Sequence, residues 1–260
     1  MLAGKRALVT GSTSGIGLGI ARALAREGVH VMLHGLGDAS ENERLRSALA
    51  AETGVTVGVH GADVSRPDDV ARLVADTERA LGGIDILINN AGIQFVAAIE
   101  DFPVERWTAI QNIVLNSSFH AIRLVVAGMK QRGWGRIINL ASAHGLVASP
   151  FKSAYVAAKH AQVGLTKSVA LELAETAVTC NAVCPGYVRT PLVETQIESQ
   201  AKAHSLPRDR VIREVILAAQ PTHRFVEIEE VAALVVYLCG DAARSITGAA
   251  IPIDGGWTAR

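Results

Sequence analysis

The sequence predicts a doubly wound α/β fold, a three-layer sandwich in which one parallel sheet lies between two layers of helices. Two observations predict it: seven short β-branched runs occur along the chain, and amphipathic runs of helical length separate most of them. A length of 260 residues suits one such domain with a large core. The sequence contains no low-complexity linker, charge block or fixed-period repeat, so we expect residues 1–260 to form a single domain.

Each of the seven runs has the composition of a strand. In chain order they are RALVT, HVMLH, VTVGVH, DILIN, RIINLA, VTCNAV and AIPID. The patterns between them, such as IGLGIARALARE and DDVARLVADTERAL, repeat apolar residues at three- and four-residue intervals, which is typical of helices. Strand and helix alternating in this way predict a seven-stranded parallel sheet covered on both faces.

The alternation is interrupted once, between residues 185 and 225. Two short polar helical patterns, VETQIESQAKAH and RDRVIREVILAAQ, fill most of this interval. So long an excursion in a compact domain is typical of a lid or a binding element. Ligands of open α/β sheets bind beyond the carboxyl ends of the strands, so we expect a helical substrate lid at about residues 190–220.

Composition narrows the classes of partner. The chain has 25 lysines and arginines and 25 aspartates and glutamates. This balance indicates neither a basic surface for binding nucleic acid nor a basic face for binding a membrane. No apolar run is long enough to cross a bilayer, and the start MLAGKRALVTG lacks signal-peptide features. We therefore expect a cytoplasmic protein whose partners are small molecules or copies of itself.

The three cysteines, Cys180, Cys184 and Cys239, lie in apolar surroundings. Their odd number favours buried, reduced thiols over a disulfide framework. Cys180 and Cys184 have no second pair of ligands at a suitable spacing, so we expect no metal site.

A glycine-rich turn, TGSTSGIG, follows the first strand and opens directly into the first helix. Gly11, Gly15 and Gly17 would let the backbone turn tightly and approach a diphosphate, which the helix amino terminus can bind through unpaired N–H groups. The spacing is GxxxGxG rather than the commoner GxGxxG. A simple tight turn is the alternative, but the position between strand and helix favours a dinucleotide site.

The end of the second strand, HVMLHGLGD, bears on which dinucleotide binds. A 2′-phosphate would require a nearby arginine or lysine, and neither Ser14 nor the HGLGD segment provides one, so NAD is favoured over NADP. The acidic residue usual after this strand is displaced to Asp38. Asp63, after the third strand, could accept a hydrogen bond from the adenine amino group or cap a helix.

The stretch SAHGLVASPFKSAYVAAKH carries the polar groups of a catalytic site. Lys159 follows Tyr155 by four residues, so their side chains share one face of a helix. The ammonium would favour the phenolate and lower the tyrosine pKa from its usual ~10, making the pair a general base and its activator. Ser142 ends a strand, where its hydroxyl could hold a substrate oxygen.

Several of these motifs together resemble the short-chain dehydrogenase/reductases. They are TGSTSGIG, NNAG at residues 89–92, Ser142 with Tyr155 and Lys159, and PGYVRT at residues 185–190, and the resemblance covers essentially the whole chain. It implies a Rossmann-type fold and hydride transfer between a carbinol carbon and a nicotinamide ring. It makes Tyr155 the acid/base and Lys159 also a ligand of the nicotinamide ribose.

The same resemblance implies the cofactor site. Asn90 would stabilise the central strand beside the cofactor, and Thr190 would steady the nicotinamide end. The implied cofactor contacts are Gly11, Thr13, Ser14, Gly15, Ile16, Gly17, Leu36, Asp63, Val64, Asn90, Ala91, Gly92, Tyr155, Lys159, Pro185, Gly186, Val188 and Thr190.

Within the family, NNAGIQ, SAHGLVAS, KSAYVAAKH, RTPLVETQI and DGGWTAR resemble the bacterial members that interconvert (R)-3-hydroxybutyrate and acetoacetate with NAD. This closer resemblance implies a polar cluster around the substrate carboxylate and an aromatic pocket wall. A small hydroxy acid needs a cation at one end, and Lys152 lies about one helical turn before Tyr155. The implied substrate residues are Gln94, His144, Lys152, Tyr187, Gln196 and Trp257.

The chain departs from the family pattern at two positions. Val114 stands where the family has an asparagine that helps to hold a proton-relaying water near the active-site lysine. Asn112 and Asn116 lie two residues away, about 200° around a helix, so we expect a weakened proton shuttle. Tyr187 stands where close relatives have tryptophan, which leaves the substrate chain length open.

Two other functions stay open at this point. One is a family enzyme for another short 3-hydroxy acid or a 3-oxoacyl thioester, a class that generally prefers NADPH. The other is a non-catalytic NAD-binding protein, although such a protein would not need Ser142, Tyr155 and Lys159. The family usually forms tetramers, and the small residues of YVAAKHAQVG would allow close helix packing, so we expect a homotetramer.

Overall fold

In the computed structural model, the chain is described for residues 2–190, 193–194, 197–198, 201 and 206–259. The strands are β1 (Arg6–Val9), β2 (His30–His34), β3 (Val57–His60), β4 (Ile86–Asn89), β5 (Gly135–Leu140), β6 (Val178–Pro185) and β7 (Ala250–Ile253). They form one seven-stranded sheet in the order β3-β2-β1-β4-β5-β6-β7, and every pairing is parallel. The predicted doubly wound fold is confirmed.

Helices connect the strands. The α-helices are α1 (Gly15–Arg26), α2 (Ala39–Thr53), α3 (Pro67–Leu81), α4 (Val104–Ile110), α5 (Ser117–Gln131), α6 (Ser153–Glu172), α8 (Arg208–Val211) and α9 (Ile228–Cys239). Two segments are π-helical, η1 (Gln111–Asn116) and η3 (Ile212–Ile216). Short 3-10 helices are η2 (Ala143–Gly145), η4 (Asp241–Ala243) and η5 (Trp257–Ala259).

Local sequence explains where several helices begin and end. The Asp38 carboxylate caps α2 by accepting from the backbone N–H groups of Ser40 and Glu41. Pro67 opens α3, where its missing N–H costs no helical hydrogen bond. Gly54 and Gly82 follow α2 and α3 with φ of 72° and 82°, the left-handed conformation that glycine adopts without strain.

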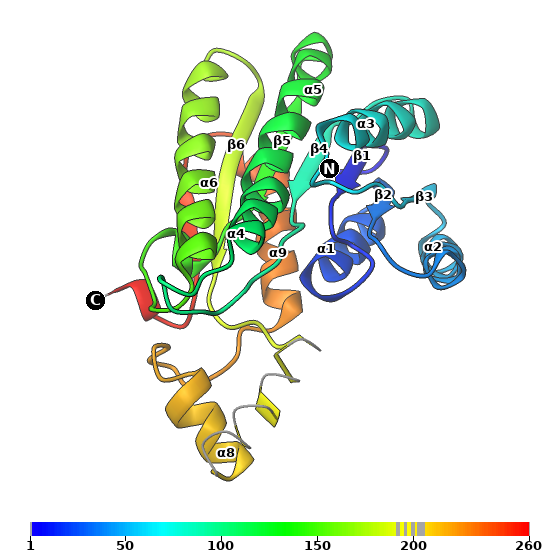
Figure 1. Cartoon of the computed structure of the whole chain (residues 1–260). Coiled ribbons are helices and arrows are strands. Elements are labelled where there is room, and N and C mark those ends of the chain that lie inside the picture. Colours follow the sequence, from blue (N-terminus) through cyan, green and yellow to red (C-terminus); the bar gives the residue numbers. More distant parts are fainter. Residues whose placement is uncertain (1, 191–192, 195–196, 199–200, 202–205, 260) are drawn as a thin grey trace.

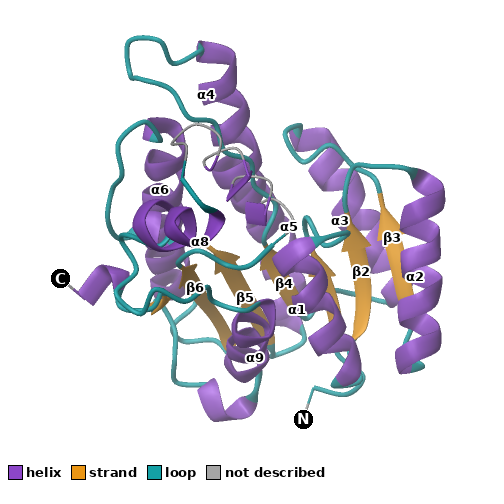
Figure 2. Cartoon of the chain, turned by 90° about the horizontal axis from the view of Figure 1, so that it is seen from below, coloured by secondary structure: helices purple, strands orange, loops and turns teal. Residues whose placement is uncertain are grey.

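The sheet buries an apolar core on each face (Figures 1 and 2). Alternate residues of a strand point to opposite faces, so in β1 Ala7 and Val9 belong to one core and Leu8 to the other. Helices α1, α2 and α9 cover the first face, and α3, α5 and α6 cover the second. Burial on both sides explains why the strands read as continuous apolar runs.

The strand order places the ligand-binding edge. Strand β1 pairs with both β2 and β4, so the chain winds in opposite directions from β1, and a crevice forms beyond the carboxyl ends of these strands. The turns after β1, β4, β5 and β6 all reach this edge, because the strands are parallel. Residues far apart in the sequence are thereby brought together there.

The segment that contains α8 lies beyond the end of the sheet to which β6 runs (Figure 1). Its described residues form a small apolar cluster of their own around Val193, Ile197, Val211 and Ile216. The second polar pattern of the expected lid forms α8 and η3, whereas much of the first pattern lies outside the described residues.

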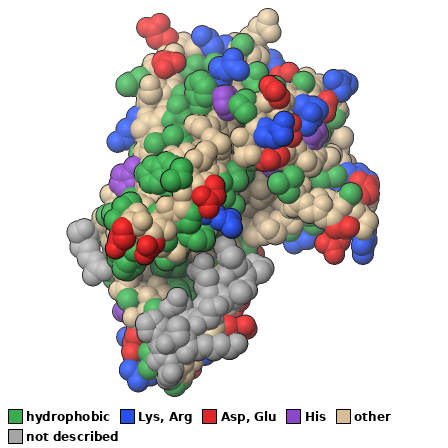
Figure 3. All heavy atoms as spheres, viewed as in Figure 1, with side chains coloured by type: hydrophobic (Ala, Val, Ile, Leu, Met, Phe, Trp, Pro, Cys, Tyr) green, Lys and Arg blue, Asp and Glu red, His purple; other side chains and the backbone are tan. Residues whose placement is uncertain are grey.

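The surface that Figure 3 draws carries basic and acidic side chains interspersed with one another. This agrees with the equal numbers of positive and negative residues. Among the described residues, no helix is long and apolar enough to cross a membrane.

Asp85, directly before β4, ties three elements together. Its carboxylate accepts from Arg6 Nε at 2.7 Å and from Arg132 Nε at 2.9 Å, and the side chain is only 4% exposed. Burial alone would raise the pKa of Asp85, but hydrogen bonds and charges from Arg6 and Arg132 outweigh it and lower the pKa. The carboxylate therefore stays ionised and anchors β1, β4 and the end of α5.

We expect Asp85→Ala to lower the free energy of unfolding by about 3 kcal/mol, because it leaves both arginines without the carboxylate that they share. Urea denaturation measures the change. Arg26→Ala is the control, since it removes an ion pair with Glu52 in which both side chains are largely exposed, and it should cost far less. Equal losses in the two variants would contradict the anchoring role of Asp85.

Candidate active site

Two adjoining cavities open at the carboxyl ends of the strands. The larger has a volume of about 570 Å³ and is lined by the ends of β1 to β6 with the turns that follow them, and by Tyr155 and Lys159 of α6. The smaller has a volume of about 190 Å³. Ile16, Gln94, Tyr155 and Thr190 line both, so the two cavities meet at Tyr155.

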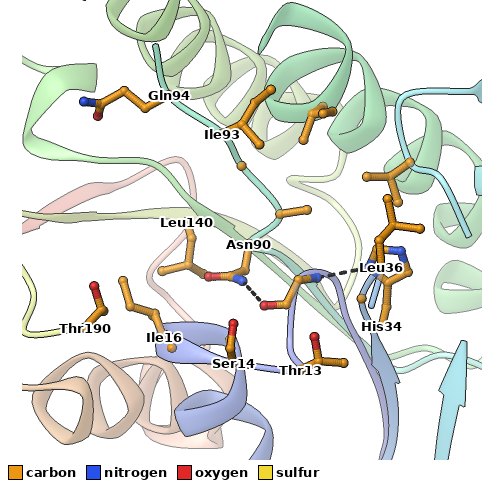
Figure 4. Close-up of a pocket in the computed structure, with 18 of the residues that line it drawn as sticks. Thr13, Ser14, Ile16, His34, Leu36, Asn90, Ile93, Gln94, Leu140 and Thr190 are labelled. Carbon is orange, nitrogen blue, oxygen red and sulfur yellow. Dashed lines mark hydrogen bonds between the residues drawn. The ribbon is translucent and has the colours of Figure 1, made fainter. Parts of the chain in front are cut away.

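The residues predicted to contact the cofactor line the larger cavity, except Gly186 and Val188, which line the smaller one. Figure 4 shows Thr13, Ser14 and Ile16 on the glycine-rich turn and the start of α1, with Asn90 and Leu140 opposite them. Six further residues line this cavity that the sequence analysis did not name as cofactor contacts: His34, Gly35, Ile93, Ile113, Leu140 and Ala141. Gln94, which was predicted to contact only the substrate, also lines it.

The glycine-rich turn is shaped to let a ligand approach its backbone. Gly11 has a φ of 63°, and a Cβ on Gly17 would lie only 2.2 Å from the Gly11 oxygen. Asn90 Nδ2 holds the turn by donating to the Gly11 oxygen at 2.8 Å (Figure 4). Ser14 precedes α1 without a side-chain cap, which leaves the helix N–H groups available to an anion. The turn therefore fits a dinucleotide diphosphate.

The far end of the larger cavity is lined by the ends of β2 and β3. His34 is buried there: its Nδ1 accepts from the Gly11 N–H at 3.1 Å, and its Nε2 lies 2.8 Å from the Ala62 oxygen. Asp63 lines the cavity, while its Oδ1 accepts from the Ser65 N–H at 3.0 Å. Asp38 does not line the described cavity, because its carboxylate is engaged as the cap of α2.

Ser142, Tyr155 and Lys159 come together where the two cavities meet. Ser142 follows β5, and its Oγ accepts from the His144 N–H at 3.1 Å. Lys159 is buried with its Nζ 5.6 Å from the centre of the Tyr155 ring. Lys159 Nζ donates to the Leu140 oxygen and, at 3.2 Å, to Gln162 Oε1. An ammonium has three N–H donors, so one remains for the cavity.

The pKa of Tyr155 differs from the sequence expectation. Burial raises it to about 12, and a hydrogen bond with Ser142 opposes this only in part. Burial also lowers the pKa of Lys159 to about 7, and the Cys184 thiol, which would favour the ammonium, does not compensate. The direction therefore differs from the lowering that the sequence predicts, because desolvation outweighs the hydrogen bond with Ser142.

The smaller cavity brings together Gln94, Ser142, His144, Lys152, Tyr155, Tyr187 and Trp257. The Tyr187 and Trp257 rings stack with centres 5.6 Å apart and planes within 5°, and His144 meets Trp257 edge to face at 4.9 Å. Tyr187 thus keeps an aromatic wall at the position where a tryptophan was expected. The side chain of Lys152 lies beside this wall, with its Nζ 3.4 Å from the Tyr187 hydroxyl.

Lys152 is the only lysine or arginine among the described residues that line the smaller cavity. Burial, and secondarily the charge of Lys152, lowers the pKa of His144 to about 4, so this imidazole is neutral at pH 7. Its Nε2 lies 2.9 Å from Ser149 Oγ. Gln196, the fourth predicted carboxylate ligand, lies outside the described residues.

Val114 stands where the family has an asparagine, and the sequence analysis expected that neither Asn112 nor Asn116 takes over its place. The surroundings of Val114 agree with this expectation. The Val114 side chain is fully buried in a cluster with Ile110, Ala154 and Ala158. Asn116 Nδ2 donates to Asn112 Oδ1 at 2.8 Å on the exposed side, so these two amides pair with each other. The segment is π-helical, which the periodicity did not predict.

Gln162, which accepts a hydrogen bond from Lys159, is a residue of this site that the sequence analysis missed. It lies three residues after Lys159 on α6 and is 1% exposed. A signal was present, because a glutamine at this spacing shares the helix face of the lysine in an otherwise apolar stretch.

Solved structures similar to this chain share its fold. L-sorbose reductase from Gluconobacter frateurii, solved with NADPH and L-sorbose, superposes with a TM-score of 0.94 at 30% identity and covers 99% of this chain and 98% of its own.

Sequence comparison gives closer relatives. A family model described as enoyl-(acyl carrier protein) reductase matches residues 11–258. The D-beta-hydroxybutyrate dehydrogenase of Rhizobium meliloti is 55% identical over 98% of this chain and 99% of its own length. The enzyme of the same name from Cupriavidus necator is 54% identical over the whole of both chains. These matches show that the chain belongs to the short-chain dehydrogenase/reductase family.

Proposed function

We propose that the protein oxidises (R)-3-hydroxybutyrate to acetoacetate with NAD as the hydride acceptor. The observation that carries the proposal is the smaller cavity, whose lining includes one cation, Lys152, and the Ser142 and Tyr155 hydroxyls. A volume of about 190 Å³ suits a short hydroxy acid. The names of the relatives from Rhizobium meliloti and Cupriavidus necator support the same substrate.

Different residues of the smaller cavity would bind the carboxylate and the carbon chain of the substrate. Lys152, Gln94 and neutral His144 would hold the carboxylate by a charge-assisted contact and hydrogen bonds. Gln196 is the fourth member of this proposed clamp. Tyr187 and Trp257 would enclose the short carbon chain with their stacked rings.

Ser142 and Tyr155 would bind the substrate hydroxyl at the junction of the cavities. Tyr155 accepts the hydroxyl proton as the C–H bond breaks, and the Lys159 ammonium stabilises the phenolate that must precede this transfer. NAD, when bound in the larger cavity, supplies a nicotinamide carbon that accepts the hydride. The raised pKa of Tyr155 means that proton removal depends on this cation.

The preference for NAD over NADP rests on the charge of the larger cavity. Lys159 is the only lysine or arginine in its described lining, and it lies at the nicotinamide end. The residues at the other end, His34, Gly35 and Leu36, offer a 2′-phosphate no such cation.

Assembly and location complete the proposal. Ala157, Ala161 and Gly164 lie on one face of α6, and a Cβ on Gly164 would meet no atom within 4 Å, so a second copy could approach closely. We infer a homotetramer, and a light-scattering mass equal to one chain would rule it out. Three free cysteines support a cytoplasmic location.

The proposed function predicts NADH formation from NAD with (R)-3-hydroxybutyrate. We expect kcat/KM to be at least about tenfold lower with the (S)-enantiomer, with 3-hydroxyhexanoate and with NADP. The (S)-enantiomer cannot place its hydroxyl and its C–H bond correctly at the same time, the longer acid must fit two more carbons into the smaller cavity, and the 2′-phosphate of NADP meets no cation in the described lining. Absorbance at the NADH band measures all four reactions. Equal turnover of a 3-oxoacyl thioester with NADPH would contradict the substrate assignment.

Lys152→Met keeps the aliphatic stem but removes the cation. We expect it to raise KM for (R)-3-hydroxybutyrate about tenfold or more while the KM for NAD stays constant, because only the substrate carboxylate loses its partner. Lys167→Met is the control, since Lys167 is an exposed lysine on the same helix and lines neither described cavity. An unchanged KM in Lys152→Met would refute the carboxylate clamp.

His144 predicts a loss of stability in weak acid. Its folded pKa of about 4 lies below the ordinary 6.5, so between these values the unfolded chain binds more protons, and stability falls as pH falls. The largest slope that one such group can give is about 1.4 kcal/mol per pH unit. Urea unfolding from pH 7.5 to 5 should show a smaller slope in His144→Gln than in the unsubstituted protein. Parallel slopes would show that His144 does not titrate in this way.

A further inference from the structure

Gln162 connects α6 to the π-helical segment η1 and the start of α5 at the level of the catalytic lysine. Its Nε2 donates to Ser118 Oγ at 2.9 Å and lies 3.3 Å from the Val114 oxygen. Its Oε1 accepts from Lys159 Nζ at 3.2 Å. A side chain that is 1% exposed thus has both ends of its amide engaged by hydrogen bonds.

The neighbours fix which way this amide points. The Val114 carbonyl can only accept hydrogen bonds, and the Ser118 hydroxyl donates its hydrogen to it at 2.9 Å. Because this hydrogen is used, the Ser118 oxygen can only accept from Gln162. The Gln162 nitrogen must therefore face η1, and its oxygen must face Lys159. The reverse orientation would set an N–H group against an ammonium and one carbonyl against another.

Lys159 needs this oxygen, because burial removes most of its hydration. It is 3% exposed, and among the described residues it forms no ion pair with a carboxylate. The titratable groups that face it are Tyr155 on α6 and the Cys184 thiol on β6. Leu140 at the end of β5 and the residues of η1 present neutral groups only. Gln162 therefore supplies the side-chain oxygen that favours the charged lysine.

This arrangement also accounts for Val114. The position at which the family resemblance implies an asparagine holds an aliphatic side chain packed against Ala154 and Ala158. In this chain an amide reaches the lysine from α6 instead. We propose that Gln162 is a positioning residue that keeps Lys159 charged, leaves one of its N–H donors for the junction of the two cavities, and replaces the amide absent at Val114. Its catalytic consequence rests on the proposed function.

Two substitutions should move the Lys159 pKa in opposite directions. Gln162→Met fills a similar volume but removes the oxygen, so we expect the lysine pKa to fall by about one unit. Gln162→Glu places a carboxylate there, so the lysine pKa should rise. NMR titration of the protein with isotope-labelled lysine measures both, with the Lys159 signal assigned by its loss in Lys159→Met.

Thr166→Val is the matched control. Thr166 is buried one turn further along α6 and accepts from Asn139 Nδ2 at 2.8 Å, so its loss also breaks a buried hydrogen bond without touching Lys159. We expect it to lower stability and to leave the Lys159 pKa unchanged. An equal Lys159 pKa in Gln162→Met and Thr166→Val would overturn the proposal. If Gln162→Met did not fold, a Lys159 pKa that failed to rise in Gln162→Glu would overturn it as well.

Turnover provides the second readout. The alkaline limb of the kcat profile, along which Lys159 loses its proton, should shift to lower pH in Gln162→Met and to higher pH in Gln162→Glu. On that limb kcat of Gln162→Met should fall about tenfold, the factor that one pKa unit gives, with KM for hydroxybutyrate within about twofold. If the unsubstituted protein did not oxidise hydroxybutyrate, the proposed function would fail, and the NMR titrations would still decide the role of Gln162.

Discussion

The proposed catalytic centre depends on one buried cation that neutral groups must stabilise. Lys159 lies under the junction of the two cavities, and its hydrogen bonds go to a backbone oxygen of Leu140 and to the amide of Gln162. Burial lowers the pKa of this ammonium to about 7, and among the described residues no carboxylate pairs with it to oppose the loss of its proton. In the proposed mechanism, the same charge allows Tyr155 to act as a base despite its raised pKa.

The parallel sheet makes this arrangement possible. Because all seven strands run one way, the glycine-rich turn, the Asn90 segment, Ser142 and the Thr190 segment meet at a single edge. Helix α6 begins at this edge, with Lys152 directly before it and Tyr155 and Lys159 on its first two turns. In the proposed function, the groups that bind the substrate carboxylate, bind its hydroxyl and activate the base therefore follow one another along a single stretch of chain.

The sequence alone could predict the features of the fold and site that depend on the periodicity of apolar residues and on the order of elements along the chain. The seven strands and the glycine-rich turn follow from local patterns, and parallel pairing brings Ser142 to Tyr155. Contacts between helices could not be predicted in this way. The link from Gln162 to Val114 and Ser118 spans more than 40 residues, and it depends on a π-helical segment that no apolar pattern marks. The raised pKa of Tyr155 reflects burial that only the packed structure reveals.

The most direct test of the whole account is a crystal structure of the protein with NAD and acetoacetate, a pair that cannot exchange a hydride. The account predicts the acetoacetate carboxylate within about 3 Å of Lys152 Nζ and its keto oxygen at similar distances from the Ser142 and Tyr155 hydroxyls. The Lys159 ammonium should meanwhile remain bonded to Gln162. A carboxylate bound at Tyr155, or acetoacetate outside the smaller cavity, would contradict it.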